Sequence, residues 1–187
     1  MASEYIKTPL CEVRWCKLVG DPHPAYDRSK PDEWSVDVVL DSKNPEHQTF
    51  IESLERAYIE EHGKSSKRSQ YYLPLSPDKD NKDLMILKMK SRCFVRKDGT
   101  KSPGPTIIDS NRNPWGGKMI GNGSKMIIAF DWYAWSGTAG NGLTPQPQMA
   151  MVVDLVEYES KPKVSIDDFE PVPGGYVETE IDEAVPF

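Results

Sequence analysis

Two segments of the chain alternate between apolar and polar side chains with a period of two residues. They are residues 84–97 and residues 125–136. Because successive side chains of a strand point to opposite faces, each segment predicts a β-strand with one face on a core. A chain with two such strands must build a sheet and cover one of its faces. The core face of the first strand is predicted to carry Met85, Leu87, Met89, Cys93 and Val95.

Further strands are predicted on both sides of these two. Residues 5–19 and 34–40 are rich in β-branched and aromatic side chains, and residues 148–158 close the series. The pair Asp98-Gly99 is a strong hairpin-turn signal, which makes residues 106–108 a returning strand. Clusters of Gly, Pro, Ser, Asn and Asp predict loops at residues 64–83, 111–117 and 137–142.

One helix is predicted between residues 44 and 63. Asn44 is suited to the N-cap, Pro45 to the first helical position, and Gly63 to the end of the helix. The helix carries an apolar stripe at helical spacing. Its members are Phe50, Ile51, Leu54, Ala57 and Tyr58.

Five or six strands with a single helix predict an all-β fold with one main helix. Among small closed sheets the OB-fold, a five-stranded antiparallel barrel with long loops, fits this order best. A β-sandwich stays open as an alternative, because turn spacing alone does not separate the two. We expect residues 1–161 to form this domain. Residues 162–187 lose the periodicity and gain Pro and Gly, which predicts a disordered acidic tail.

The charge is unevenly distributed along the chain, although the net charge is only −6. Residues 64–125 hold 14 basic and 5 acidic side chains, whereas residues 164–187 hold 7 acidic and no basic ones. This separation suggests a surface that binds a polyanion beside a segment that imitates one. Ordinary solvated charge is the alternative interpretation.

The polar face of residues 84–97 combines cations with an aromatic ring. Phe94 lies between Arg92 and Arg96 in the two-residue register, so a base stacked on the ring would have a cation on either side for its phosphates. A solvated basic edge strand would look similar, and core packing is equally open for each further aromatic. The predicted DNA-binding residues are Tyr71, Tyr72, Lys88, Lys90, Arg92, Phe94, Arg96, Trp115, Lys118, Lys125, Tyr133 and Trp135.

The chain ends in acids followed by a small apolar residue, Pro and Phe. A flexible acidic arm of this kind can dock Phe187 in an apolar pocket of a partner while its α-carboxylate meets a basic side chain. The ending resembles the C-terminal tip of bacterial single-stranded DNA-binding proteins, in which acids precede Ile-Pro-Phe. Ala184 departs from that pattern. The predicted partner-binding residues are Asp182, Glu183, Val185, Pro186 and Phe187.

Residues 1–160 resemble phage-encoded single-stranded DNA-binding proteins of the podovirus replication type. The resemblance rests on the early strands, on the turn G-N-G-S-K at 121–125, and on F-D-W-Y at 130–133 with V-V-D-L-V-E-Y at 152–158. It implies an OB-fold, protection of single-stranded DNA in phage replication and recombination, and strand annealing. It also implies tail contacts with replication proteins such as DNA polymerase and helicase. A homodimer is one assembly that the sequence allows.

Enzymatic motifs are weak in this sequence. Residues 115–125 are rich in glycine but lack the Gly-Lys-Ser/Thr of a phosphate-binding loop and precede a strand. Asp154 with Glu159 and Lys161 faintly resembles the carboxylate–lysine set of metal-dependent nucleases. We therefore expect a non-enzymatic protein without metal or cofactor. An RNA-binding OB or cold-shock-like module is the main alternative, and a nuclease is the weaker one.

The location of the protein is predicted from two absences. The N-terminal residues lack the apolar stretch of a secretory signal, and no run of eighteen apolar residues is present. The three cysteines, Cys11, Cys16 and Cys93, form no C-x-x-C pair and are expected to be reduced. These features predict a cytoplasmic protein without membrane contact, located in the bacterial host if the gene is a phage gene.

Overall fold

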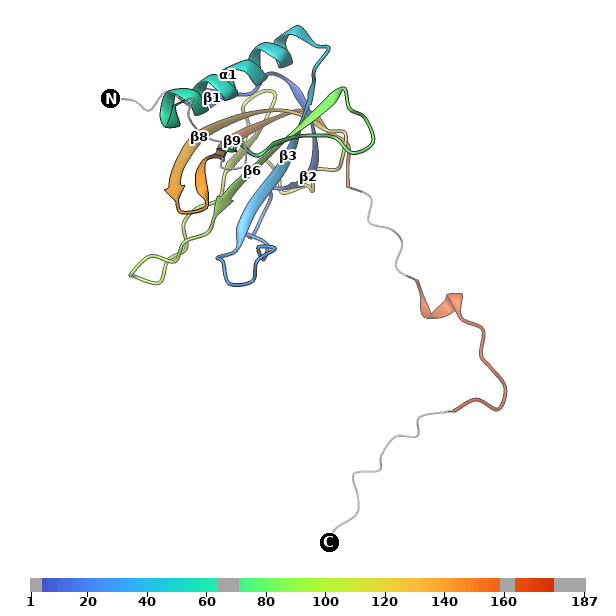
Figure 1. The fold of residues 1–187 in the computed structure, drawn as a ribbon. Coiled ribbons are helices and arrows are strands. Elements are labelled where there is room, and N and C mark those ends of the chain that lie inside the picture. Colours follow the sequence, from blue (N-terminus) through green and yellow to red (C-terminus); the bar gives the residue numbers. More distant parts are fainter. Residues whose placement is uncertain (1–4, 64–70, 159–163, 177–187) are drawn as a thin grey trace.

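The computed structural model describes residues 5–63, 71–158 and 164–176, except the side chain of Tyr71. Five long strands are neighbours in the antiparallel order β9-β8-β2-β3-β6 (Figure 1). β6 and β9 contact each other across the remaining gap, which closes the sheet into a partly open barrel. This is the arrangement of an OB-fold, as the sequence predicts. The five strands are β2 (Cys11–Lys17), β3 (Glu33–Asp41), β6 (Leu84–Arg92), β8 (Lys125–Gly137) and β9 (Gly140–Asp154).

Four short strands extend the barrel. β1 (Ile6–Lys7) pairs with β8, and β5 (Leu75–Pro77) pairs with β6. β4 (Tyr71–Tyr72) and β7 (Thr106–Asp109) pair with β9 in parallel. The prediction that residues 106–108 return against residues 84–97 is therefore wrong. The Asp98-Gly99 turn does close a hairpin, but the returning segment reaches only the bridge between Val95 and Lys101.

The hairpin between β8 and β9 replaces a predicted loop. Gly137 pairs with Gly140, so only Thr138 and Ala139 form the turn, and β9 begins eight residues before residue 148. Pro145 and Pro147 hide this strand in the sequence, because proline lacks the N–H that a central strand uses. In the described pairings both prolines fall between the partners of β4 and β7, where β9 pairs with β8 alone.

The helix α1 (Pro45–His62) lies across one end of the barrel (Figure 1). The Asn44 side chain accepts a hydrogen bond from the backbone N–H of Glu46 and caps the helix as predicted. At the other end of the helix, the Tyr58 hydroxyl donates to the Asn141 carbonyl at 2.9 Å. His62 Nε2 donates to the Gly142 carbonyl at 3.0 Å. These two bonds fix the first residues of β9 to the helix.

The core fills the barrel interior and the space under α1. On β8 the buried parity is Met126, Ile128 and Phe130, and the Phe130 ring meets Phe50 of α1 edge to face at 6.2 Å. Burying each such side chain contributes about 1.5–3 kcal/mol to folding. The prediction that Val95 belongs to the core face is wrong. β6 ends at Arg92, and the chain then leaves the barrel as a hairpin that carries Val95. Its side chain is 67% exposed.

The described part of the predicted tail is residues 164–176. It holds one 3-10 turn, Ile166–Asp168, capped by Ser165, and its side chains are exposed. The five predicted partner-binding residues at the C-terminus lie outside the described residues. Within the described ranges no helix is both long and apolar enough to cross a lipid bilayer.

Candidate nucleic-acid interface

A hollow of about 650 Å³ opens where the β2–β3 loop, β6 and the β8–β9 hairpin meet. We call it the aromatic groove. Five of the twelve predicted DNA-binding residues line it, contributed by strands that are distant in sequence. Among the described residues, its lining includes three cations and no carboxylate. The lining residues are Lys30, Lys90, Arg92, Phe94, Tyr133, Trp135, Thr144 and Gln146.

The three aromatic rings of the groove differ in how exposed they are and in which neighbours hold them. Phe94 and Tyr133 are each 55% exposed, so their faces are open to a ligand. Trp135 is half-buried, and its Nε1 donates to Thr144 Oγ1 at 3.3 Å. Tyr72 packs against Trp135 with 5.4 Å between ring centroids and 33° between ring planes. Tyr133 and Trp135 share the outward parity of β8, and the short turn that follows holds them at the rim of the barrel.

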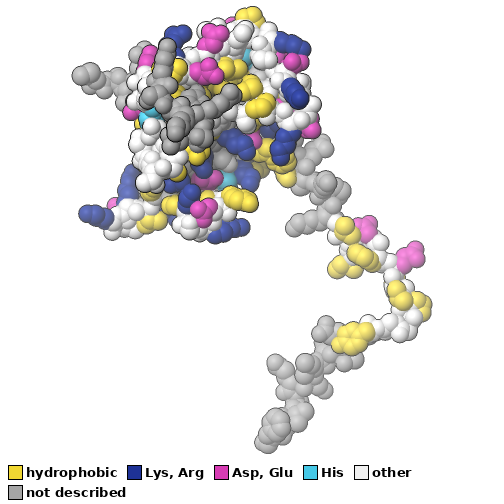
Figure 2. Space-filling model, in the orientation of Figure 1, with side chains coloured by type: hydrophobic (Ala, Val, Ile, Leu, Met, Phe, Trp, Pro, Cys, Tyr) yellow, Lys and Arg dark blue, Asp and Glu magenta, His cyan; other side chains and the backbone are white. Residues whose placement is uncertain are grey.

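The cations of the groove are only partly neutralised. Lys90 Nζ lies 3.7 Å from Glu33 Oε2, and Lys30 Nζ lies 3.4 Å from Asp27 Oδ2. Arg92 makes no ion pair within the part of the chain that the structure describes. Figure 2 shows Lys and Arg side chains around the lower end of the barrel, where the β2–β3 loop and the hairpin after β6 project.

The outer face of β3 brings two acids, Glu33 and Asp37, to this surface. The register places Glu33 opposite Arg92 and Asp37 opposite Lys88. Burial against the sheet raises the pKa of Asp37, while Lys88 and Arg14 act in the opposite direction. Charges of both signs therefore alternate over the middle of the face, in contrast to the aromatic groove.

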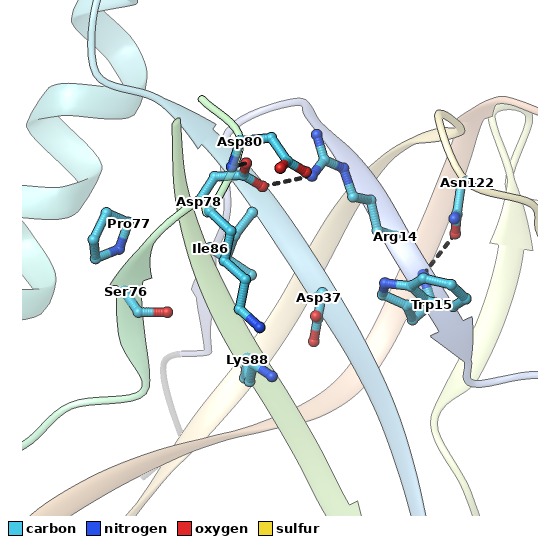
Figure 3. A pocket seen from close by; sticks show the side chains of 11 residues that line it. Arg14, Trp15, Asp37, Ser76, Pro77, Asp78, Asp80, Ile86, Lys88 and Asn122 are labelled. Atoms are coloured by element: carbon cyan, nitrogen blue, oxygen red, sulfur yellow. Dashed lines mark hydrogen bonds and ion pairs between the residues drawn. The ribbon is translucent and has the colours of Figure 1, made fainter. Parts of the chain in front are cut away.

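Two further hollows continue the groove along the same face. One of about 340 Å³ shares Lys90 and Thr144 with the aromatic groove. The next, of about 530 Å³, shares Asp37 and Lys88 with its neighbour (Figure 3). The three hollows thus form one track over β6 and β3, the face on which OB-folds bind oligonucleotides.

The other predicted residues lie at several distances from the groove. Lys88 lies in the middle of the track, Arg96 is exposed on the hairpin beyond Phe94, and Tyr72 supports Trp135. Tyr71 belongs to β4 beside Tyr72, and its side chain lies outside the described residues.

The three remaining predicted residues, Trp115, Lys118 and Lys125, lie away from the track. Trp115 is half-buried against the core, and its Nε1 donates to the Lys118 carbonyl at 2.8 Å. Lys118 pairs with Glu157 at 2.7 Å, and the Lys118 ammonium lowers the pKa of that glutamate. Lys125 pairs in register with Asp154, at the opposite end of β8 from Tyr133.

Sequence reasoning missed several residues of the track. Thr144 and Gln146 lie between the predicted loop at residues 137–142 and the predicted strand at residues 148–158, and Lys30 lies between the predicted strands at residues 5–19 and 34–40. The β2–β3 loop also carries Tyr26, which is fully exposed. The signal that could have found Lys30 is the OB-fold itself, because the loop between its first two strands borders the binding face.

The described residues give no structural support to the nuclease alternative. Asp154 ends β9 at the surface, and Glu159 and Lys161 lie outside the described ranges. Within those ranges no group of three or more His, Cys, Asp or Glu side chains is placed to hold a metal ion.

Several solved structures of phage proteins have the same fold. The chain is 17% identical to gp2.5, a single-stranded DNA-binding protein encoded by bacteriophage T7, with a TM-score of 0.65, covering 88% of this chain and 99% of that one. It is 8% identical to the single-stranded DNA-binding protein of bacteriophage Enc34 in complex with ssDNA, with a TM-score of 0.61 and coverages of 87% and 91%. A C-terminally truncated form of the Enc34 protein matches at 11% identity and a TM-score of 0.61, with coverages of 83% and 88%. At these identities the likeness establishes the fold. No protein-family model matches the sequence, and the search of curated proteins found no match.

Proposed function

We propose that this chain binds single-stranded DNA in the aromatic groove without reading its sequence. The observation that carries the proposal is the convergence of Phe94, Tyr133 and Trp135 with three cations in a hollow whose described lining has no carboxylate. Every base has a face that can stack on such a ring, and the cations neutralise phosphates whatever the sequence. The solved neighbours of this fold, one of them complexed with ssDNA, support the same ligand.

The biological role we propose is protection of unwound DNA during replication and recombination, as a phage protein acting in the bacterial cytoplasm. The protein binds stoichiometrically and performs no chemistry. The acidic C-terminal residues, with Phe187 at their end, recruit replication proteins such as polymerase or helicase. A homodimer is compatible with this role.

The ligand is tested by fluorescence polarisation with labelled oligothymidylate over a series of salt concentrations. Each neutralised phosphate of a single strand contributes a slope of about −0.7 in log K against log salt. We expect a clear negative slope, and Arg92→Ala should make it shallower by about one phosphate. Lys118→Ala is the matched control, because that lysine lies outside the groove and is paired with Glu157. Wild-type protein that binds duplex DNA as tightly as the single strand would contradict the proposal.

RNA is the competing ligand. The same rings and cations accept either backbone, since selection against RNA requires a contact to the 2′-hydroxyl. Parallel titrations with oligomers of matched sequence decide between them. Tighter binding of the RNA oligomer would replace the proposed function with the RNA-binding alternative.

A further inference from the structure

Trp15 is turned out of the barrel by an irregularity in β2. Cys11 and Val13 point into the core, and Trp15 is the next residue of that parity. The register with β3 shifts between Arg14 and Lys17, and a bulge of this kind re-aims one side chain. As a result Cys16 is buried, while Trp15 is 65% exposed.

The backbone of Trp15 is held in an unfavourable conformation for a bulky residue. Its φ is +50°, in the left-handed region that residues other than glycine rarely adopt. The Trp15 N–H donates to Asn122 Oδ1 at 2.8 Å, which fixes the bulge from the loop before β8 (Figure 3). The exposed ring gains little free energy from burial that could offset this backbone strain. Residues in such strained backbone conformations cluster at ligand sites.

The ring borders the third hollow of the track, together with Arg14, Asp37 and Lys88. Arg14 Nη1 lies 2.6 Å from Asp78 Oδ2, so the charge of Asp78 is already matched. Within the described residues Lys88 makes no ion pair. Asp37 lies opposite Lys88 across the strand pair, and Asp80 also lines the hollow. The hollow therefore offers an aromatic face, and the Lys88 ammonium lies between this face and the aromatic groove.

We infer that Trp15 is a second stacking platform for single-stranded DNA. The strand leaves the aromatic groove, passes Lys88 on the outer face of β6 and β3, and stacks a base on the Trp15 ring. Asn122 is a positioning residue that holds the ring outward. This inference rests on the proposed function and adds a second contact point to it.

The separation of the two platforms sets how long a strand must be to use both. Arg14, the neighbour of Trp15 on β2, pairs with Asp37 on β3, and Asp37 pairs with Lys88 on β6. Phe94 follows Lys88 by six residues along the chain. At about 3.3 Å per residue along a strand and about 4.8 Å between strands, the platforms are on the order of 20 Å apart. A short oligomer fills only the aromatic groove, and a longer one reaches Trp15.

The test is the affinity for oligothymidylates from about 4 to about 16 nucleotides, the range of site sizes known for OB-folds. Trp15→Ala should weaken the binding of the longest oligomers by roughly 5- to 150-fold, the range for one stacked base, and leave the shortest unchanged. Trp15→Phe should restore the binding, and Asn122→Ala should weaken it in the same length-dependent way. Phe94→Ala should weaken binding at every length.

The control is Tyr5→Ala, which removes an exposed ring that lines none of the three hollows. Thermal unfolding of each variant checks that the barrel is retained. Equal affinity of wild type and Trp15→Ala at every length would overturn the inference and leave the proposed function standing. A wild-type protein that binds no oligomer would instead overturn the proposed function.

Discussion

Gly142 lies against the indole ring of Trp135, and a Cβ added to Gly142 would come within 2.3 Å of Trp135 Cε2 and Cζ2. The two residues are direct cross-strand partners on β9 and β8, and Tyr72 is the partner of Gly142 on the other side. The rings of Trp135 and Tyr72 contact each other over Gly142, the residue between them in the sheet, which has no side chain. The aromatic groove thus depends on a residue that has no side chain of its own.

Gly142→Ala should displace the Trp135 ring and weaken the binding of single-stranded DNA. The expected loss is about 1 kcal/mol or more, because one stacked base contributes about 1–3 kcal/mol. Polarisation titration measures it. Gly137→Ala is the matched control, since a Cβ there would meet no atom within 4 Å. Equal losses in the two variants would show that the Trp135 ring is not the cause.

Phe94→Ala should lower the affinity for oligothymidylate by about 1–3 kcal/mol through the loss of one stacking face. Val95→Ala removes the neighbouring exposed side chain, which lines none of the hollows of the track, and should leave the affinity unchanged. The two variants are compared in the same titration. A larger effect of Val95→Ala would place the strand on the other side of the hairpin.

Removing the acids of β3 should tighten the binding of single-stranded DNA. Glu33 lies beside Lys90, and Asp37 faces Lys88 across the strand pair, so both oppose the phosphates that these lysines would neutralise. Glu33→Gln and Asp37→Asn should each raise the affinity most at low salt, where the repulsion is least screened. Titration at two salt concentrations tests this. A decrease in affinity would mean that the carboxylates orient the lysines instead.

The buried thiols should make stability fall at alkaline pH. Burial raises the pKa of Cys11 to about 12 and of Cys16 to about 11, from an ordinary value of 9.0. A raised pKa in the folded state contributes stability that is complete below pH 9 and is lost as the pH rises toward the folded values. Urea unfolding at pH 8 and pH 10.5 should show this loss. Cys16→Ala should show a smaller drop between the two pH values, and an identical drop would assign the effect to other groups.

The parts of the fold that the sequence predicts correctly are those set by local pattern. The alternation on β6 and β8 and the caps of α1 each depend on side chains within one segment, so they can be read without knowing the rest of the chain. The same alternation brings Lys90, Arg92 and Phe94 to the outer face. The pairing partner of each strand is not local, and there the predictions are less accurate.

The errors and the omissions have physical reasons that a single sequence conceals. Pro145 and Pro147 are tolerated in β9 because they fall where the strand pairs with β8 alone. Trp15 breaks the parity of β2 because of a bulge whose stabilising contact, Asn122, is 107 residues away. The acids of β3 were visible in the sequence, but their position opposite Lys88 and Arg92 depends on the register between two strands.

The two-residue turn between β8 and β9 has a thermodynamic consequence. In the hairpin arm formed by residues 133–144, all of which the structure describes, only Thr138 and Ala139 lie outside the paired ladder. Tyr133 and Trp135 are therefore preorganised before any ligand arrives. Ordering a mobile arm on binding would cost conformational entropy, and this arm is ordered already when the chain folds. The entropy lost when a strand binds to these two rings therefore comes mainly from the nucleic acid.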